Sequence, residues 1–172
     1  MTDRTIEPTR FAEGPPMLLA GVRRWHAFAD APRDIPAQWV EFHALSGLPP
    51  RAGAVTYGVV CASEPQRGRF EYFCAIEVPS FEGLGADVGR MRVPAQRYAV
   101  FTHRGHVSGL QATWRAIWEE WLPRSGYQAA NTPDFERYDQ RYEAATASGE
   151  MEIWFPIAVD GQARWSGGAP PS

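Results

Sequence analysis

The sequence predicts an α+β fold: two pseudo-symmetric β-α-β-β units in tandem, forming one antiparallel sheet with helices on one face and a ligand cleft between the halves. Two observations predict this fold. Apolar runs of strand length alternate with two longer segments of helical periodicity, and the order strand, helix, strand, strand occurs twice along the 172 residues. Clusters of Gly and Pro separate these runs, as turns require.

The first unit occupies about residues 4–83. Its predicted elements are a strand at 15–24, a helix at 34–46, and a hairpin with strands at 54–61 and 69–78. In the helix, Asp34 is the expected N-cap and Pro36 falls in the first turn. Trp39 and Phe42 follow at helical spacing, so their shared face should contact the sheet.

The second unit occupies about residues 84–160 and has the same order. Its predicted elements are strands at 86–93 and 96–103, a helix at 108–122, a short segment at 135–139 and a strand at 150–158. Ser108 and Gln111 match the S-x-x-Q capping box at the start of the helix. The segment 135–139 is compatible with a strand or with a helical turn, and we expect a loop at 140–149.

The second helix carries most of the tryptophan in its half of the chain. Its apolar stripe consists of Leu110, Trp114, Ile117 and Trp121. A stripe at this spacing is mainly core. Trp118 is offset from the stripe, so it is the best candidate on this helix for the edge of the cleft.

Composition excludes several classes of function. The net charge of −3 and the pI of about 5.8 argue against nucleic acid as a partner. All 17 basic residues are Arg, which excludes a Schiff-base lysine and a P-loop lysine. Cys61 and Cys74 are too few for a disulfide scaffold or a zinc site, and His103 with His106 lacks a third ligand. We therefore expect no metal and no cofactor.

The chain has neither a long apolar run nor a signal-peptide pattern. We expect a soluble cytoplasmic protein with no membrane partner, folded as one domain over residues 1–160. Residues 1–14 should be irregular, and residues 161–172 should form a flexible tail. The edge strands of such a sheet are compatible with a homodimer.

The strand at 150–158 carries the most informative pattern. Alternation places Met151, Ile153 and Phe155 on one face and the pair Glu152 and Trp154 on the other. If the second face is open to water, this pair is an ordinary solvated surface. If that face lines the cleft, Glu152 is a buried acid among aromatic rings, which favours capture of a cation or, with a raised pKa, general-base catalysis.

The first hairpin contributes Tyr57 and Tyr72, whose hydroxyls would either bond a ligand or face solvent. Glu71, Glu77 and Glu136 are expected at the surface or as turn anchors.

Several segments resemble the GyrI-like family, which is also described as the gyrase-inhibitor-like or AraC-type effector-binding small-molecule domain. They are QRYAVFTHRGHVSGLQATWRAIWEEWLP (96–123), TPDFERYD (132–139), EMEIWFPI (150–157), VTYGVV (55–60) and RFEYFCAIEV (69–78). The resemblance covers about residues 4–158 and implies the tandem fold predicted above. The family includes effector domains of multidrug-responsive transcription regulators, stand-alone proteins, a gyrase modulator and a branch that hydrolyses cyclopropane-bearing genotoxins.

The resemblance also implies a set of site residues. Glu152 corresponds to the acid of the pocket, and Tyr72 to an aromatic position of the first hairpin. Trp154, Trp118, Tyr57 and Phe42 are carried over as further ligand contacts. No DNA-binding segment accompanies these motifs, so we expect no direct binding of nucleic acid.

Three functions remain open from the sequence. The first is a stand-alone domain that binds aromatic, amphipathic and cationic small molecules, with Glu152 neutralising the charge. The alternative is a hydrolase of cyclopropane-type electrophilic genotoxins that uses Glu152 as general base. The second alternative is a protein-interaction modulator of a topoisomerase.

Overall fold

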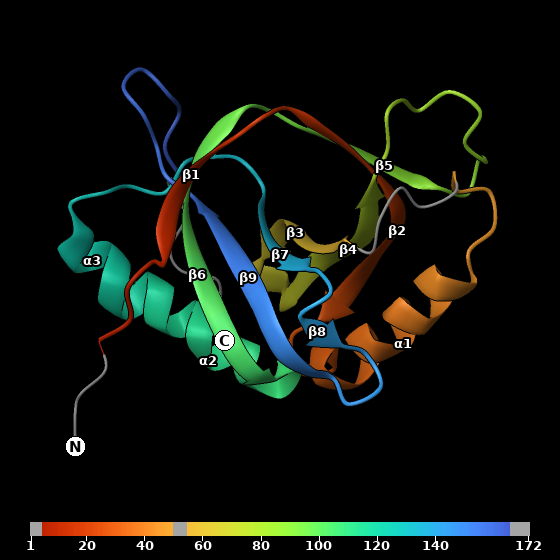
Figure 1. The fold of residues 1–172 in the computed structure, drawn as a ribbon, viewed down its shortest axis with the longest axis horizontal. Coiled ribbons are helices and arrows are strands. Elements are labelled where there is room, and N and C mark those ends of the chain that lie inside the picture. Colours follow the sequence, from red (N-terminus) through yellow and green to blue (C-terminus); the bar gives the residue numbers. More distant parts are fainter. Residues whose placement is uncertain (1–4, 50–54, 166–172) are drawn as a thin grey trace.

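One curved sheet organises the part of the chain, residues 5–49 and 55–165, that the computed structural model describes (Figure 1). Its nine strands are β1 (Arg10–Gly14), β2 (Met17–Ala27), β3 (Thr56–Glu64), β4 (Arg69–Glu77), β5 (Gly89–Val93), β6 (Gln96–His106), β7 (Asp134–Tyr138), β8 (Tyr142–Glu143) and β9 (Ser148–Pro156). The helical elements are α1 (Ala31–Ala44), α2 (Leu110–Ala116), a π-helical turn (Ile117–Trp121), α3 (Leu122–Ser125) and two 3-10 turns (Pro65–Arg67 and Val107–Gly109). Among the described residues, no helix is long and apolar enough to cross a membrane.

The strand order confirms the predicted repeat. The sheet runs β1-β6-β9-β7-β3-β4-β2-β5, with β8 paired to β9, and every pairing is antiparallel. The first unit contributes β2-β4-β3 and the second contributes the mirror order β7-β9-β6, so the halves meet where β3 pairs with β7. Each half also lends an edge strand to the other, because β1 pairs with β6 and β5 pairs with β2.

The sheet has two chemically different faces. On one face, α1 and the α2–α3 segment cover side chains of β4 and β9 such as Tyr72, Ile153 and Phe155. In Figure 1 the α2–α3 segment passes behind β6 at the lower left, and α1 lies at the lower right beside β2. On the other face, Tyr57, Tyr98 and their neighbours form a second apolar cluster. The connections from β1 to β2 and from β5 to β6 arch over the top of the sheet in this view.

The first helix starts one turn earlier than predicted. The backbone N–H groups of Arg33 and Asp34 both donate to the carbonyl of Asp30, so Asp30 rather than Asp34 occupies the N-cap position. Pro32 then fills the first turn, and Pro36 lies inside the helix. The pattern Asp-x-Pro occurs twice in this segment, at Asp30 and at Asp34, and the helix begins at the first occurrence.

The second helix is less regular than predicted. Its start is capped by His106, whose ring Nδ1 accepts from the N–H of Ser108 at 3.1 Å, so Ser108 is not the N-cap. The π-helical turn then changes the register of the helix, which brings Trp118 toward Phe155 with ring centroids 5.0 Å apart. Trp121 also meets Phe155, at 6.0 Å.

Two short strands were not predicted. The segment 1–14 contains β1, and the segment 140–149 contains β8. β1 exists because β6, from a distant part of the chain, supplies its hydrogen bonds, and local sequence carries no signal for that. β8 is a two-residue strand that pairs locally with the start of β9. The segment 135–139, left open between strand and helical turn, is a strand.

The predicted flexible tail begins with an ordered segment. The N–H of Asn131 donates to the carbonyl of Ala163 at 3.1 Å, and that of Trp165 donates to Ala129 at 2.8 Å. Residues 166–172 of the tail lie outside the described residues.

Candidate functional site

The six predicted site residues lie on two faces of the sheet, not around one cleft. Tyr72, Phe42 and Trp118 lie on the helix-bearing face. Tyr57 and Trp154 belong to the cluster on the opposite face, and alternation along β9 places Glu152 there too. The predicted alternation of β9 itself is confirmed, because Met151, Ile153 and Phe155 pack under the helices.

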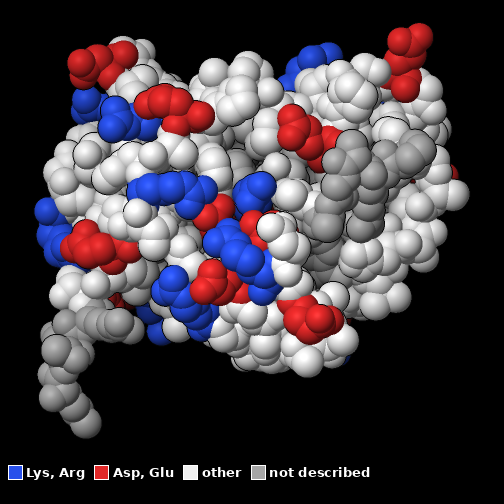
Figure 2. Space-filling model, viewed as in Figure 1, with Lys and Arg blue, Asp and Glu red and all other residues white. Residues whose placement is uncertain are grey.

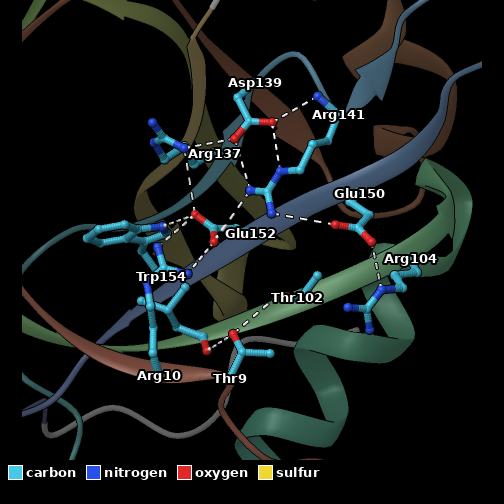
Figure 3. Close-up of polar contacts among 11 residues, drawn as sticks. Thr9, Arg10, Thr102, Arg104, Arg137, Asp139, Arg141, Glu150, Glu152 and Trp154 are labelled. Atoms are coloured by element: carbon cyan, nitrogen blue, oxygen red, sulfur yellow. Dashed lines mark hydrogen bonds and ion pairs between the residues drawn. The ribbon is translucent and has the colours of Figure 1, made fainter.

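Glu152 is buried, with 2% of its side chain exposed, but its charge already has partners. The guanidinium of Arg10 binds it through both terminal nitrogens, one of them 3.1 Å from Oε1 (Figure 3). The indole Nε1 of Trp154 donates to the same Oε1 at 3.2 Å. Burial alone would raise the pKa of Glu152, but these hydrogen bonds and the nearby Arg charges outweigh it and hold the pKa below its ordinary value.

Two further arginines extend this cluster. Arg137 Nη1 lies 3.7 Å from Glu152 Oε1, and Arg141 Nη2 lies 3.5 Å from Oε2. Both also bind Asp139, at 3.0 Å and 2.9 Å (Figure 3). Glu152 is therefore the centre of an ion-pair network and not a buried acid waiting for a cation.

A second buried acid, Glu136, lies on the helix-bearing face. It stands opposite Ile153 in the β7–β9 register and has 7% exposure. The Tyr138 hydroxyl donates to its Oε2 at 2.7 Å, and the Tyr72 hydroxyl donates to its Oε1 at 3.4 Å. Burial raises the pKa of Glu136 to about 7, although the two tyrosine hydrogen bonds act in the opposite direction.

Gly58 makes the contact between Tyr72 and Glu136 possible. On β3 this glycine pairs with Glu136 on one side and with Cys74 on the other. A Cβ atom at Gly58 would lie 2.0 Å from the Tyr72 hydroxyl oxygen. The missing side chain thus lets the tyrosine reach across β3 to the carboxylate.

Aromatic rings surround the Glu136 carboxylate on this face. Trp39 of α1 lies edge-on to Tyr138 at 5.6 Å and to Tyr72 at 6.4 Å. Tyr142 meets Tyr138 at 4.9 Å. Trp39 itself is half-buried. Among the described residues, no arginine or histidine forms an ion pair with Glu136.

Trp118 has an unsatisfied polar atom. Its ring packs on Phe155 while the residue as a whole stays half-buried. The indole Nε1 is buried and has no hydrogen-bond partner. A buried donor without an acceptor is uncommon in folded proteins and marks a place where a partner would be stabilising.

Sequence reasoning missed Glu136 because the strand at 135–139 was uncertain. As a strand, F-E-R-Y-D alternates, so that Glu136 and Tyr138 point to one face while Phe135 and Arg137 point to the other. That pairing of acid and tyrosine was the available signal. Among the residues described, no group of three or more His, Cys, Asp or Glu is placed to hold a metal ion.

Comparisons with known proteins agree with this architecture. A family model described as GyrI-like small molecule binding domain matches residues 7–158. The transcriptional regulator BrlR of Pseudomonas aeruginosa is 32% identical over 154 residues, which are 86% of this chain and 54% of BrlR. The chain thus spans about half the length of that relative.

Two solved structures share the fold. SAV2435 bound to tetraphenylphosphonium superposes with a TM-score of 0.66 at 16% identity, covering 87% of this chain and 93% of SAV2435. The integron cassette protein VCH_CASS2 of Vibrio cholerae superposes with a TM-score of 0.64 at 18% identity. The superposition covers 89% of this chain and 97% of VCH_CASS2.

Proposed function

Because the chain belongs to the GyrI-like small molecule binding domain family, we propose that it binds lipophilic aromatic cations on the helix-bearing face of the sheet. In this proposal Glu136 supplies the counter-charge, and the rings of Trp39, Tyr72 and Tyr138 contact the ligand.

The proposal rests on the protonation state of the Glu136 carboxyl group and on its lack of a cationic partner among the described residues. A buried carboxylate must be protonated or paired with a cation, because an unpaired buried charge is costly. Glu136 has tyrosine hydroxyls but no ion pair among the described residues, and its pKa of about 7 leaves it poised between the two forms. A bound cation would favour the ionised form and be held by it.

The surrounding rings add affinity for the same class of ligand. A cation over an aromatic face gains about 0.5–2 kcal/mol, with the larger value in a desolvated site. Trp39 and Trp118 are both half-buried on this face. Phe42 packs edge-on against Trp39 at 5.6 Å and supports it from behind.

A related fold supports the choice of ligand class. SAV2435, which shares this architecture, has been solved with tetraphenylphosphonium, a lipophilic aromatic cation. We extend that chemistry to this chain on the strength of Glu136.

The proposal moves the ligand-binding acid from Glu152 to Glu136. Glu152 is satisfied by Arg10 and has a lowered pKa, which weakens it both as a cation trap and as a general base. Its geometry therefore gives no support to the hydrolase alternative. No contact described here favours a topoisomerase partner.

Titration calorimetry with tetraphenylphosphonium tests the proposal, using Glu136→Gln and Glu152→Gln as a matched pair. We expect Glu136→Gln to weaken binding at pH 8 by about tenfold or more, because hydrogen bonds and contacts to a charge contribute about 1.5–3 kcal/mol. Glu152→Gln should change binding by less than about threefold. Circular dichroism of both variants controls for folding. Loss of binding in Glu152→Gln alone would mean that Glu152, on the opposite face of the sheet, is the ligand-binding acid.

A further inference from the structure

The strand β1 forms one edge of the sheet, and within the described residues no strand pairs with its outer side. On its inner side β1 pairs with β6, from Arg10 opposite Val100 to Gly14 opposite Gln96 (Figure 1). The outer side of an edge strand presents N–H and C=O groups that can bond to a further strand. β1 is therefore a place where another chain can extend the sheet.

The hydrogen bonds of β6 decide which groups of β1 face outward. The carbonyl of Arg97 accepts from the N–H of Ile157, the residue after β9, so Arg97 directs its backbone away from β1. The carbonyl of Val100 instead accepts from a residue just before β1. Because backbone direction alternates along a strand, the even-numbered residues of β1 bond to β6. The N–H and C=O groups of Phe11 and Glu13 therefore face outward.

Two copies of β1 match each other in one antiparallel register. In this register Ala12 faces Ala12 of the second copy, and Phe11 faces Glu13 of the second copy. The N–H and C=O of Phe11 then bond to the C=O and N–H of that Glu13, and the twofold axis repeats both bonds. Ala12 lies on the axis in a pair without hydrogen bonds, where Cα atoms approach to about 4.5 Å and a small side chain fits.

The neighbouring registers are less favourable. A shift by two residues in one direction sets Glu13 opposite Glu13, and like charges directly opposite each other destabilise a sheet. The same shift in the other direction sets Glu13 opposite Thr9, whose N–H already donates to Val100. A shift by one residue would bring side chains from opposite faces together.

The side chains beside this edge suit the same register. Phe11 and Tyr127 are both exposed, and their rings lie 5.4 Å apart. The guanidinium of Arg97 lies over the Phe11 ring at 5.7 Å, and its Nε is 3.6 Å from Glu13 Oε1. Glu13 of the second copy, directly opposite Phe11, would come within reach of the same guanidinium. The edge thus offers an apolar contact and two symmetric Glu–Arg pairs.

The charges at the two edges of the sheet favour β1 for contact between identical chains. β1 contains one arginine and one glutamate, and Figure 2 shows acidic and basic side chains mixed over the part of the molecule where β1 lies in Figure 1. Arg10 would face Gly14 of the second copy, which has no side chain to displace it from Glu152. The other edge strand, β5, contains Arg90 and Arg92 and no acid, so two copies of β5 would repel each other.

We propose that the protein forms a twofold dimer in which two β1 strands pair about Ala12 and join the two sheets into one. The partner is a second copy of this chain. This inference goes beyond the proposed cation site and does not rest on it, because no residue of β1 contacts Glu136.

Analytical ultracentrifugation of the full chain tests the proposal. We expect a reversible monomer–dimer equilibrium at micromolar concentrations, since an interface built on one short strand is small. A protein that stays monomeric at high micromolar concentration would overturn the proposal.

Variants at Glu13 locate the interface. Glu13→Pro removes an outward N–H, which an edge strand tolerates, and should abolish the dimer. Glu13→Arg should weaken dimerisation about tenfold or more, because it sets like charges together, and adding Arg97→Glu should restore it to within about threefold. Glu82→Arg, the same charge change on the exposed connector before β5, should leave the dimer intact. A dimer that persists in Glu13→Pro would place the interface elsewhere.

A cysteine on the axis tests the register, including the case in which Glu13→Pro fails to fold. Ala12→Cys should form an intermolecular disulfide under mild oxidation, because Cα atoms about 4.5 Å apart lie within the range that disulfides span. Glu13→Cys should form little, and the wild type with its free Cys61 and Cys74 is the control. Faster crosslinking of Glu13→Cys than of Ala12→Cys would refute the register. None of these variants changes a residue that contacts Glu136, so failure of the dimer would leave the cation site to its own test.

Discussion

Glu136 and Glu152 lie on neighbouring strands of one sheet, yet they face opposite sides and are satisfied in opposite ways. Glu152 has Arg10 bound to both of its oxygens and two more arginines within 4 Å. Glu136 has two tyrosine hydroxyls and no ion pair among the described residues. The pKa of the first is lowered and that of the second is raised to about 7. Burial alone therefore does not fix the charge state of an acid, because the presence or absence of an internal counter-charge decides the direction in which its pKa moves.

The largest consequence of this contrast is a pH dependence of stability. Because the folded pKa of Glu136 is raised, its contribution is fully present below about pH 4 and is lost as the pH rises to about 7. The expected loss is about 3 kcal/mol in the free energy of unfolding. Urea titrations of wild type and Glu136→Gln from pH 4 to pH 8 measure it, since the variant should lack this slope.

The contribution of Glu152 to stability should depend on pH in the opposite direction. Because the pKa of Glu152 is lowered in the folded protein, Glu152 contributes stability at pH values above the ordinary pKa of a Glu side chain. That stability is lost as the pH falls through the pKa of Glu152 in the folded protein. Identical pH slopes for Glu136→Gln and Glu152→Gln would contradict the distinction between the two acids.

The same substitution at the two acids gives the next largest effect. Glu152→Gln leaves Arg10 and its neighbours without their central carboxylate, and removing one partner of a buried pair costs about 3–5 kcal/mol. Arg10 is 46% exposed, so water compensates in part and we expect about 2 kcal/mol at pH 7. Glu136→Gln should change stability by less than about 1 kcal/mol at pH 4, where the Glu136 carboxyl is protonated, because the amide still accepts from the tyrosines. At pH 7 the variant should be the more stable protein, because its amide carries no buried charge. Thermal or urea unfolding of the pair measures both, and equal losses would refute the contrast.

The smallest expected effect concerns Trp118. Its buried Nε1 has no acceptor, and an unsatisfied buried donor costs about 1–3 kcal/mol. Trp118→Phe removes that donor but also some apolar area, so the free energy of unfolding should stay within about 1 kcal/mol of wild type. Trp121→Ala, at a ring with 3% exposure, should instead cost about 3–5 kcal/mol. Urea unfolding compares the two, and a similar loss in both would show that Trp118 is also core.

The sequence alone determined much of the architecture. Periodicity identified the two repeated units, and alternation along 150–158 correctly separated Ile153 from Glu152. These features are local: a strand has a period of two and a helix one of 3.6, so the face of each residue follows from its neighbours in the chain.

Tertiary structure decided which residues meet across the sheet. Arg10 reaches Glu152 from 142 positions away, in a strand that exists only because β6 pairs with it. Glu136 became a buried acid because Gly58 opens a path for Tyr72 and because α1 brings Trp39 over the same face. Such partners are chosen by strand order and register, which are set by long-range packing, so no local pattern could distinguish an acid paired inside the protein from one left for a ligand.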